Sequence, residues 1–154
     1  MQDHPDFEPA DTPDTLTWSD AFLLGFGPMD SIHEEFVQLV GRLQTAPDAE
    51  LPALLDAFAD HAQRHFDEEN TWMEQTEFPA RECHIDEHAA VMKSVQEVRA
   101  LLAQGDVDIC RDLANELARW FPGHADYLDS ALSHWMCQKR LGGKPVVIRR
   151  NVAS

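Results

Sequence analysis

The sequence predicts an all-α protein, an up-down-up-down four-helix bundle preceded by an extended N-terminal arm. Three observations favour this fold. Apolar residues recur at spacings of three and four in four separate stretches, which is the pattern of amphipathic helices. The breaks between these stretches are short, which favours antiparallel neighbours in a bundle. No stretch combines period-two alternation with hairpin turns, as strands would require.

Each predicted helix ends at residues that break a helix. In chain order, the apolar stripes cover residues 29–43, 51–73, 84–102 and 109–135. The breaks that follow them are TAPD at 45–48, Phe78-Pro79, the stop and cap QGD at 104–106, and Gly142-Gly143 with Pro145. We therefore expect a single bundle domain over residues 29–141.

Both ends of the chain are predicted to lie outside the bundle. Residues 1–28 contain four prolines and two glycines, which is typical of an extended arm or loop. We expect apolar residues of the arm to fold it back onto the core, namely Trp18, Phe22, Leu23, Leu24 and Phe26. Residues 142–154 are predicted to be a short basic tail.

The composition of the chain indicates which partners to exclude and where in the cell to expect the protein. The chain has 154 residues and a net charge of −16, a field that repels phosphate backbones and anionic lipids, so we expect neither nucleic acid nor membrane as a partner. The start is acidic and Pro-rich, unlike a secretory signal. Three cysteines without CxxC spacing indicate reduced thiols. We expect the protein to be cytoplasmic. We also expect a monomer, because the apolar stripes of the four helices can pack against one another within one bundle.

Polar residues of metal-binding types interrupt the apolar stripes. A lone inward histidine is usually a satisfied core residue, but five from four helices would leave many buried nitrogens unpaired. Pairs spaced four apart share one helix face. Histidine with carboxylate suits iron, manganese or zinc, and seven ligands are too many for one zinc. The inward residues are His33, His65, Glu69, His84, His88 and His124, and the family resemblance given next adds Asp129 as the seventh candidate.

The order and spacing of these residues resemble the bacteriohemerythrin family, whose members carry a hemerythrin-like HHE cation-binding domain. The pattern reads His33, then HFDEE at 65–69, HIDEH at 84–88 and HADYLD at 124–129. The segments GFGPMDSIH and MEQTEFP also resemble the family, and the likeness extends from about Trp18 to Trp135. The paired Glu-x-x-His motifs of ferritin-like bundles are absent from the sequence.

The resemblance implies a centre of two iron ions, Fe2+ or Fe3+, with an oxo or hydroxo bridge. It assigns His84, His88 and His124 to one iron, His33 and His65 to the other, and Glu69 and Asp129 to both. The iron with two histidines would keep one open position for dioxygen. The implied function is reversible dioxygen binding for carriage, storage or delivery, not enzymatic catalysis, although weak peroxidase or oxidase activity would be compatible with such a site.

Family pocket positions carry over to four aromatic residues, which are expected to form the walls of an oxygen pocket: Phe36, Phe66, Trp120 and Phe121. The same residues could equally be ordinary core aromatics. The chain departs from the family pattern at Pro122-Gly123, and at Ala125, where a larger aliphatic residue is usual. These departures concern the size of the pocket and the rate of oxidation.

The spacing between His124 and Asp129 predicts an irregular helix. Five residues turn an ideal helix by about 500°, so these two side chains would point roughly 140° apart. Pro122 cannot donate to the carbonyl of Ala118 and should kink the helix. We therefore predict an irregular turn within residues 118–129, of the π type.

Three other functions stay open at the level of sequence. The first is a sensor or regulatory module for oxygen, nitric oxide or iron, which the single-domain length disfavours. The second is a di-iron enzyme with peroxidase or oxidase activity, and the third is a structural bundle filled with zinc. Outside the ligand set, His61 is expected at the boundary of its stripe and His134 to pack or face solvent.

Overall fold

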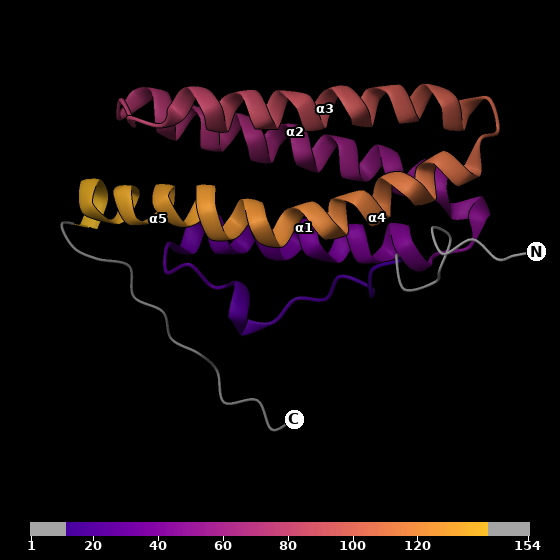
Figure 1. The fold of residues 1–154 in the computed structure, drawn as a ribbon, viewed down its shortest axis with the longest axis horizontal. Helices are drawn as coiled ribbons and strands as arrows, with labels where there is room; N and C mark the ends of the chain where they lie inside the picture. The colour runs from indigo at the N-terminus through magenta and orange to yellow at the C-terminus, as the bar shows by residue number, and fades with distance from the viewer. Residues whose placement is uncertain (1–11, 142–154) are drawn as a thin grey trace, which may run out of the picture.

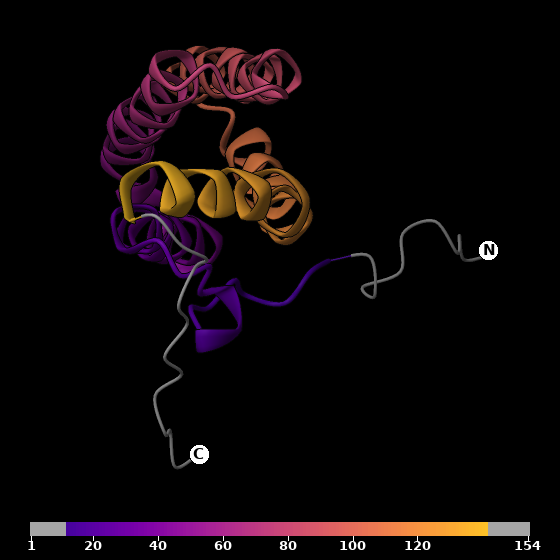
Figure 2. The same cartoon turned by 90° about the vertical axis from the view of Figure 1, so that its left-hand side faces the viewer.

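A computed structural model describes residues 12–141, and within this range the chain is helical without strands. Four long helices make up the bundle: α1 (Gly27–Thr45), α2 (Leu51–Gln75), α3 (Arg81–Ala103) and α4 (Val107–His124). Each packs against the next along the chain, and α4 returns to α1, as Figures 1 and 2 show. The predicted fold class is confirmed.

The fourth predicted helix is longer and less regular than the other three. After α4 the chain continues through a π segment, η5 (Ala125–Asp129), then α5 (Ser130–Met136) and a second π segment, η6 (Cys137–Leu141). In η5 the Ser130 N–H bonds to the Ala125 carbonyl, five residues back. The predicted irregular turn is therefore confirmed, whereas η6 was not anticipated.

Local signals in the sequence account for the helix ends. Pro28 sits in the first turn of α1, where its missing N–H costs nothing. The Asp106 side chain accepts a hydrogen bond from the Ile109 N–H at 3.1 Å and caps α4. Between α3 and α4, Gly105 has φ +99°, a left-handed conformation that glycine adopts without strain. Two short 3-10 turns, η3 (Asp20–Phe22) and η4 (Asp48–Glu50), precede α1 and α2.

The core consists of two apolar clusters with a polar layer between them. The larger cluster is built around Phe36, Phe58, Phe66 and Phe121, and the smaller one includes Met29, Trp72 and Leu132. Along α1 and α2 the two clusters lie on opposite sides of buried histidine and glutamate residues. The fold therefore places a layer of titratable side chains across the middle of the bundle.

The segment before α1 lies along the outside of the bundle (Figure 2). The Leu16 N–H donates to Gln44 Oε1 at 2.7 Å, and the ring of Phe22 packs edge-on against Phe121 at 5.4 Å between centroids. At its end, the Asp30 carboxylate accepts the N–H groups of Leu24 and Gly25. The described part of the predicted arm thus contacts α1 and α4.

The predicted domain limits can be compared only in part with the structure. Since α1 begins at Gly27, the helix starts two residues before the predicted boundary at residue 29. Residues 1–11 of the arm and the basic tail at 142–154 lie outside the described residues. Over residues 12–141, none of the helices has the length and hydropathy needed to span a membrane.

Replacing Gly41 with Ala should detach the arm from α1. A Cβ at this position would lie 2.7 Å from the backbone oxygen of Leu16, closer than any real contact. We expect faster amide hydrogen exchange at Leu16. Gly123→Ala is the matched control, because a Cβ there meets nothing within 4 Å, and it should stabilise the helix by about 0.5–1 kcal/mol. Unchanged exchange at Leu16 in Gly41→Ala would contradict the proposed close approach.

Candidate metal centre

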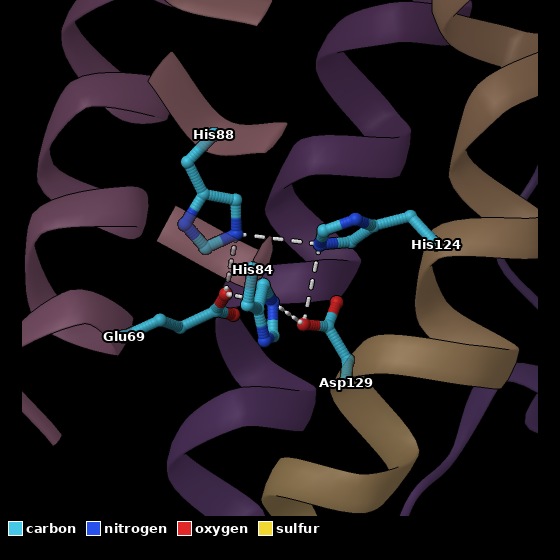
Figure 3. A group of neighbouring side chains, drawn as sticks. All are labelled: Glu69, His84, His88, His124 and Asp129. Carbon is cyan, nitrogen blue, oxygen red and sulfur yellow. Dashed lines mark hydrogen bonds and ion pairs between the residues drawn. The ribbon is translucent and has the colours of Figure 1, made fainter. Parts of the chain in front are cut away.

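The seven predicted ligand residues converge in the polar layer at the centre of the bundle. All of them are buried, with exposed fractions of 5% or less. Figure 3 shows five of them, with side chains from α2, α3 and the α4–η5 helix pointing toward one another. In chain order, His33 lies on α1, His65 and Glu69 on α2, His84 and His88 on α3, His124 at the end of α4, and Asp129 at the end of η5.

Their ligand atoms form two groups that share one residue. Within each group, the potential ligand atoms all lie within 4.8 Å of one another. One group has three histidines and the other has two, and Glu69 belongs to both. The groups are Glu69, His84, His88, His124 and Asp129 on one side, and His33, His65 and Glu69 on the other.

The two oxygens of Glu69 face different groups of histidines. Oε2 lies 2.9 Å from His65 Nε2 and 3.2 Å from His33 Nε2. Oε1 lies 3.2 Å from His88 Nε2 and 3.9 Å from His84 Nε2. A carboxylate in this position can therefore bridge two metal ions, one in each group.

Asp129 repeats this arrangement from the opposite helix. Oδ2 lies 3.0 Å from His33 Nε2, while Oδ1 lies 2.9 Å from His84 Nε2 and 3.3 Å from His124 Nε2. The π segment makes this possible, because its wider turn brings residues five apart onto the same face. Asp129 therefore faces the cluster together with His124, as the irregular helix predicted.

Several polar atoms of the cluster lack hydrogen bonds, although nitrogen and oxygen atoms approach closely. Within residues 12–141, these buried atoms include Glu69 Oε1, both carboxylate oxygens of Asp129, and His84 Nε2. A buried polar atom without a partner is costly. Imidazole nitrogens and carboxylate oxygens are the donors that divalent first-row metals accept. The residues present therefore fit a binuclear metal site.

The electrostatics of the cluster favour the charged forms of Glu69, Asp129 and His33 despite their complete burial. Burial and the nearby Asp129 raise the pKa of Glu69, yet His65 and His33 hold this pKa well below its usual range. Burial likewise opposes ionisation of Asp129, but His33, His124 and His84 lower its pKa strongly. Burial lowers the pKa of His33, and the two carboxylates outweigh it and raise the value to about 10. Without metal, a proton on His33 therefore neutralises part of the negative charge of Glu69 and Asp129.

Two residues that the sequence interpretation did not assign contact the outer nitrogens of ligand histidines. Glu87 Oε1 lies 2.6 Å from His124 Nδ1, and Asn70 Oδ1 lies 2.9 Å from His88 Nδ1. Helical spacing held a signal for the first, because Glu87 follows His84 by three residues and shares its side of α3. For Asn70, spacing on a single helix carries no comparable signal.

The four predicted pocket residues are distributed over both halves of the cluster. Phe121 packs edge-on against His33 at 5.2 Å between centroids, and Phe36 packs edge-on against His65 at 5.6 Å. These two residues therefore contact the half with two histidines.

The other two pocket residues contact the half with three histidines. Phe66 stacks on His88 at 4.1 Å and also contacts His65, whereas Trp120 stacks on His124 at 4.2 Å. Trp120 still approaches Phe36, at 6.2 Å between centroids. The aromatic residues thus surround the cluster as a whole.

The two remaining described histidines lie outside the ligand groups. His61 is buried beside His65, at 5.5 Å between ring centroids, and its Nδ1 is 3.1 Å from a carboxylate oxygen of the exposed Glu35. Burial and the neighbouring His65 lower the pKa of His61 to about 4. His134 is exposed and contacts Gln138.

Comparison with known proteins gives relatives that are all described as hemerythrins. A family model described as "Hemerythrin HHE cation binding domain" matches residues 25–133. A bacteriohemerythrin from Ralstonia nicotianae is 39% identical over 80% of this chain and 90% of its own length. One from Stenotrophomonas maltophilia is 26% identical over 83% and 91%, and a myohemerythrin from Sipunculus nudus is 24% identical over 76% and 90%. No solved structure matches. The resemblance inferred from the ligand pattern is confirmed.

Replacing His84 with Ala should reduce the metal content below two ions per chain. His84 Nε2 lies 2.9 Å from Asp129 Oδ1 and 3.9 Å from Glu69 Oε1, so its loss leaves these two carboxylates buried with less compensating charge. We expect the free energy of unfolding of the metal-loaded protein to fall by about 3–5 kcal/mol. Elemental analysis and chemical denaturation measure the two effects. The exposed His134→Ala is the matched control, and equal behaviour of the two variants would show that His84 is not a ligand.

The metal-free chain should lose stability as the pH rises from about 6.5 to about 10. Folding raises the pKa of His33 from 6.5 to about 10. The contribution of His33 to the free energy of unfolding is therefore fully present below pH 6.5 and is lost as the pH rises through about 10. The pKa of His124, also raised by the cluster, acts in the same direction. Urea denaturation at several pH values measures the slope. His33→Gln should flatten it, and an unchanged slope in that variant would contradict the assignment.

Proposed function

The chain belongs to the hemerythrin family, defined by its HHE cation-binding domain, and from this premise we propose that it is a non-haem di-iron protein that binds dioxygen reversibly. The observation that carries the proposal is the unequal division of five histidines around two shared carboxylates. Carriage, storage or delivery of dioxygen are the roles that fit such a protein.

The donor atoms assign each residue a role toward two irons. His84, His88 and His124 would hold one iron, His33 and His65 the other, and Glu69 and Asp129 would contribute an oxygen to each. The half with two histidines has one protein donor fewer, so this half leaves room for an exogenous ligand. Bound iron would supply the reversible electron transfer that dioxygen binding requires.

The protein side chains around the two-histidine half keep it dry. Phe36 and Phe121 stack on each other at 5.1 Å between centroids and are 1% exposed or less. Phe22 of the N-terminal segment covers Phe121 from outside. Exclusion of water from such a site hinders side reactions that consume protons. A dry aromatic pocket therefore favours release of intact dioxygen over its conversion.

An optical titration tests the proposal. The iron-loaded protein is reduced without oxygen to a colourless form, and oxygen is then admitted. We expect a visible absorption band that appears with dioxygen and disappears again under vacuum, over repeated cycles. Elemental analysis of the same sample should give two irons per chain.

Two outcomes would contradict the proposal in different ways. Direct conversion to the oxidised spectrum, without a band that vacuum removes, would favour a redox enzyme over a reversible carrier. One zinc per chain in the protein as purified would favour a structural bundle. His134→Ala, which changes an exposed histidine, should behave as the unmodified protein does, whereas His33→Ala should lose the band because it removes a donor from the two-histidine half.

A further inference from the structure

One carboxylate outside the ligand groups joins two residues of the neighbouring helix. Glu87 projects from α3, and its Oε1 accepts the Nδ1–H of His124 at 2.6 Å and the Nε1–H of Trp120 at 3.0 Å. His124 and Trp120 lie four residues apart on α4, so they share one face of that helix. Their rings stack at 4.2 Å between centroids. A single oxygen atom therefore connects a candidate ligand to the aromatic residue packed on it.

The chemistry of this contact fixes which nitrogen of His124 carries a proton. An ionised carboxylate can only accept hydrogen bonds, so the proton lies on Nδ1. The opposite nitrogen, Nε2, then points into the cluster, 3.3 Å from Asp129 Oδ1 and 3.3 Å from His88 Nε2. Both distances fit a nitrogen that shares a metal with these neighbours.

No other candidate ligand has such a partner among the described residues. Nδ1 of His33, His65 and His84 is buried without a hydrogen bond in this part of the chain. His88 contacts the side chain of Asn70, but an amide can donate as well as accept and does not dictate the tautomer. Glu87 is therefore distinctive in both its charge and its geometry.

Glu87 lies at the boundary between a surface cavity and the buried cluster. Glu87 and Trp120 line a surface cavity of about 280 Å³ between α3 and α4, together with Val91, Leu113 and Leu117. The Glu87 side chain is 39% exposed, whereas the His124 side chain is 2% exposed. Glu87 and Trp120 thus lie between this cavity and His124.

We propose that Glu87 is a positioning residue of the metal centre, which holds His124 in the Nδ1-protonated form with Nε2 aimed at the metal and anchors Trp120 beside it. This inference rests on the proposed di-iron site, but not on dioxygen binding. Carboxylates that orient metal-bound histidines in this way typically contribute 10- to 100-fold to metal affinity. Glu87 accordingly controls how long the three-histidine half retains its metal.

The test uses the full chain loaded with zinc, a diamagnetic probe that needs no oxygen. Glu87→Leu removes the acceptor, and Glu87→Gln keeps an acceptor oxygen without the charge. Glu97→Leu and Glu97→Gln are matched controls, because Glu97 is exposed on the same helix. The readouts are the rate of zinc extraction by a chelator, the nitrogen-15 and proton resonances of the His124 Nδ1–H group, and the melting temperature of the metal-free chain.

We expect Glu87→Leu to speed extraction of one of the two zinc ions by about 10-fold or more. Its His124 Nδ1–H resonance should move upfield and exchange faster with water. Glu87→Gln should fall closer to the unmodified protein in both readouts, and the Glu97 variants should match that protein.

The proposal is overturned if Glu87→Leu releases zinc no faster than Glu97→Leu, or if its Nδ1–H group stays protected. It is also overturned if the variant merely lowers the melting temperature of the metal-free chain and leaves zinc extraction unchanged. A protein that binds two metals but no dioxygen would sink the proposed function and leave the role of Glu87 intact.

Discussion

The structure depends on the burial of two carboxylates and five imidazoles in one layer across a helical bundle. Each isolated charge there would be strongly unfavourable, so the layer is stable only if its members neutralise one another or share metal ions. The pKa values of Glu69, Asp129 and His33 all shift toward the charged forms. The cluster is therefore preorganised to exchange protons for cations, and the apolar clusters on either side keep it dry.

The irregular fourth helix follows from the same requirement. A regular α-helix could not turn both His124 and Asp129 toward the layer, and the π segment at Ala125–Asp129 solves this with one wider turn. Pro122 removes a backbone donor just before it, which lowers the cost of leaving regular geometry. A feature that reduces the regularity of the helix is thus what completes the set of ligands.

Much of this arrangement was predictable because it depends on the spacing of residues within single helices. Apolar stripes identified four helices, polar residues within them identified six candidate ligands, and the family resemblance added Asp129. The spacing of His124 and Asp129 even indicated where the helix must deviate. Helix ends were predictable where a cap marks them, since the cap expected at residues 104–106 directly precedes α4 at Val107. The start of α1 differs from the expected boundary by two residues, at Gly27 and not at residue 29.

Contacts between helices could not be predicted from the sequence in the same way. The contact between Glu87 and His124 depends on how α3 and α4 are rotated against each other, which periodicity alone leaves open. Phe66 and Trp120, which the family resemblance assigns to the oxygen pocket, stack on His88 and His124 of the three-histidine half. The second π segment at Cys137–Leu141 has no pair of functional residues whose spacing would have required it.

The distribution of the seven ligand residues over the chain has a consequence for biosynthesis. His33 is made early and Asp129 late, so about two thirds of the chain separates the first ligand from the last. A nascent chain that ends before η5 already carries all five histidines and Glu69, but it lacks Asp129, the second shared carboxylate. The complete set of candidate ligands is therefore assembled only after the last helix has docked, so a metal held by all seven residues would stabilise completed bundles and not partly synthesised ones.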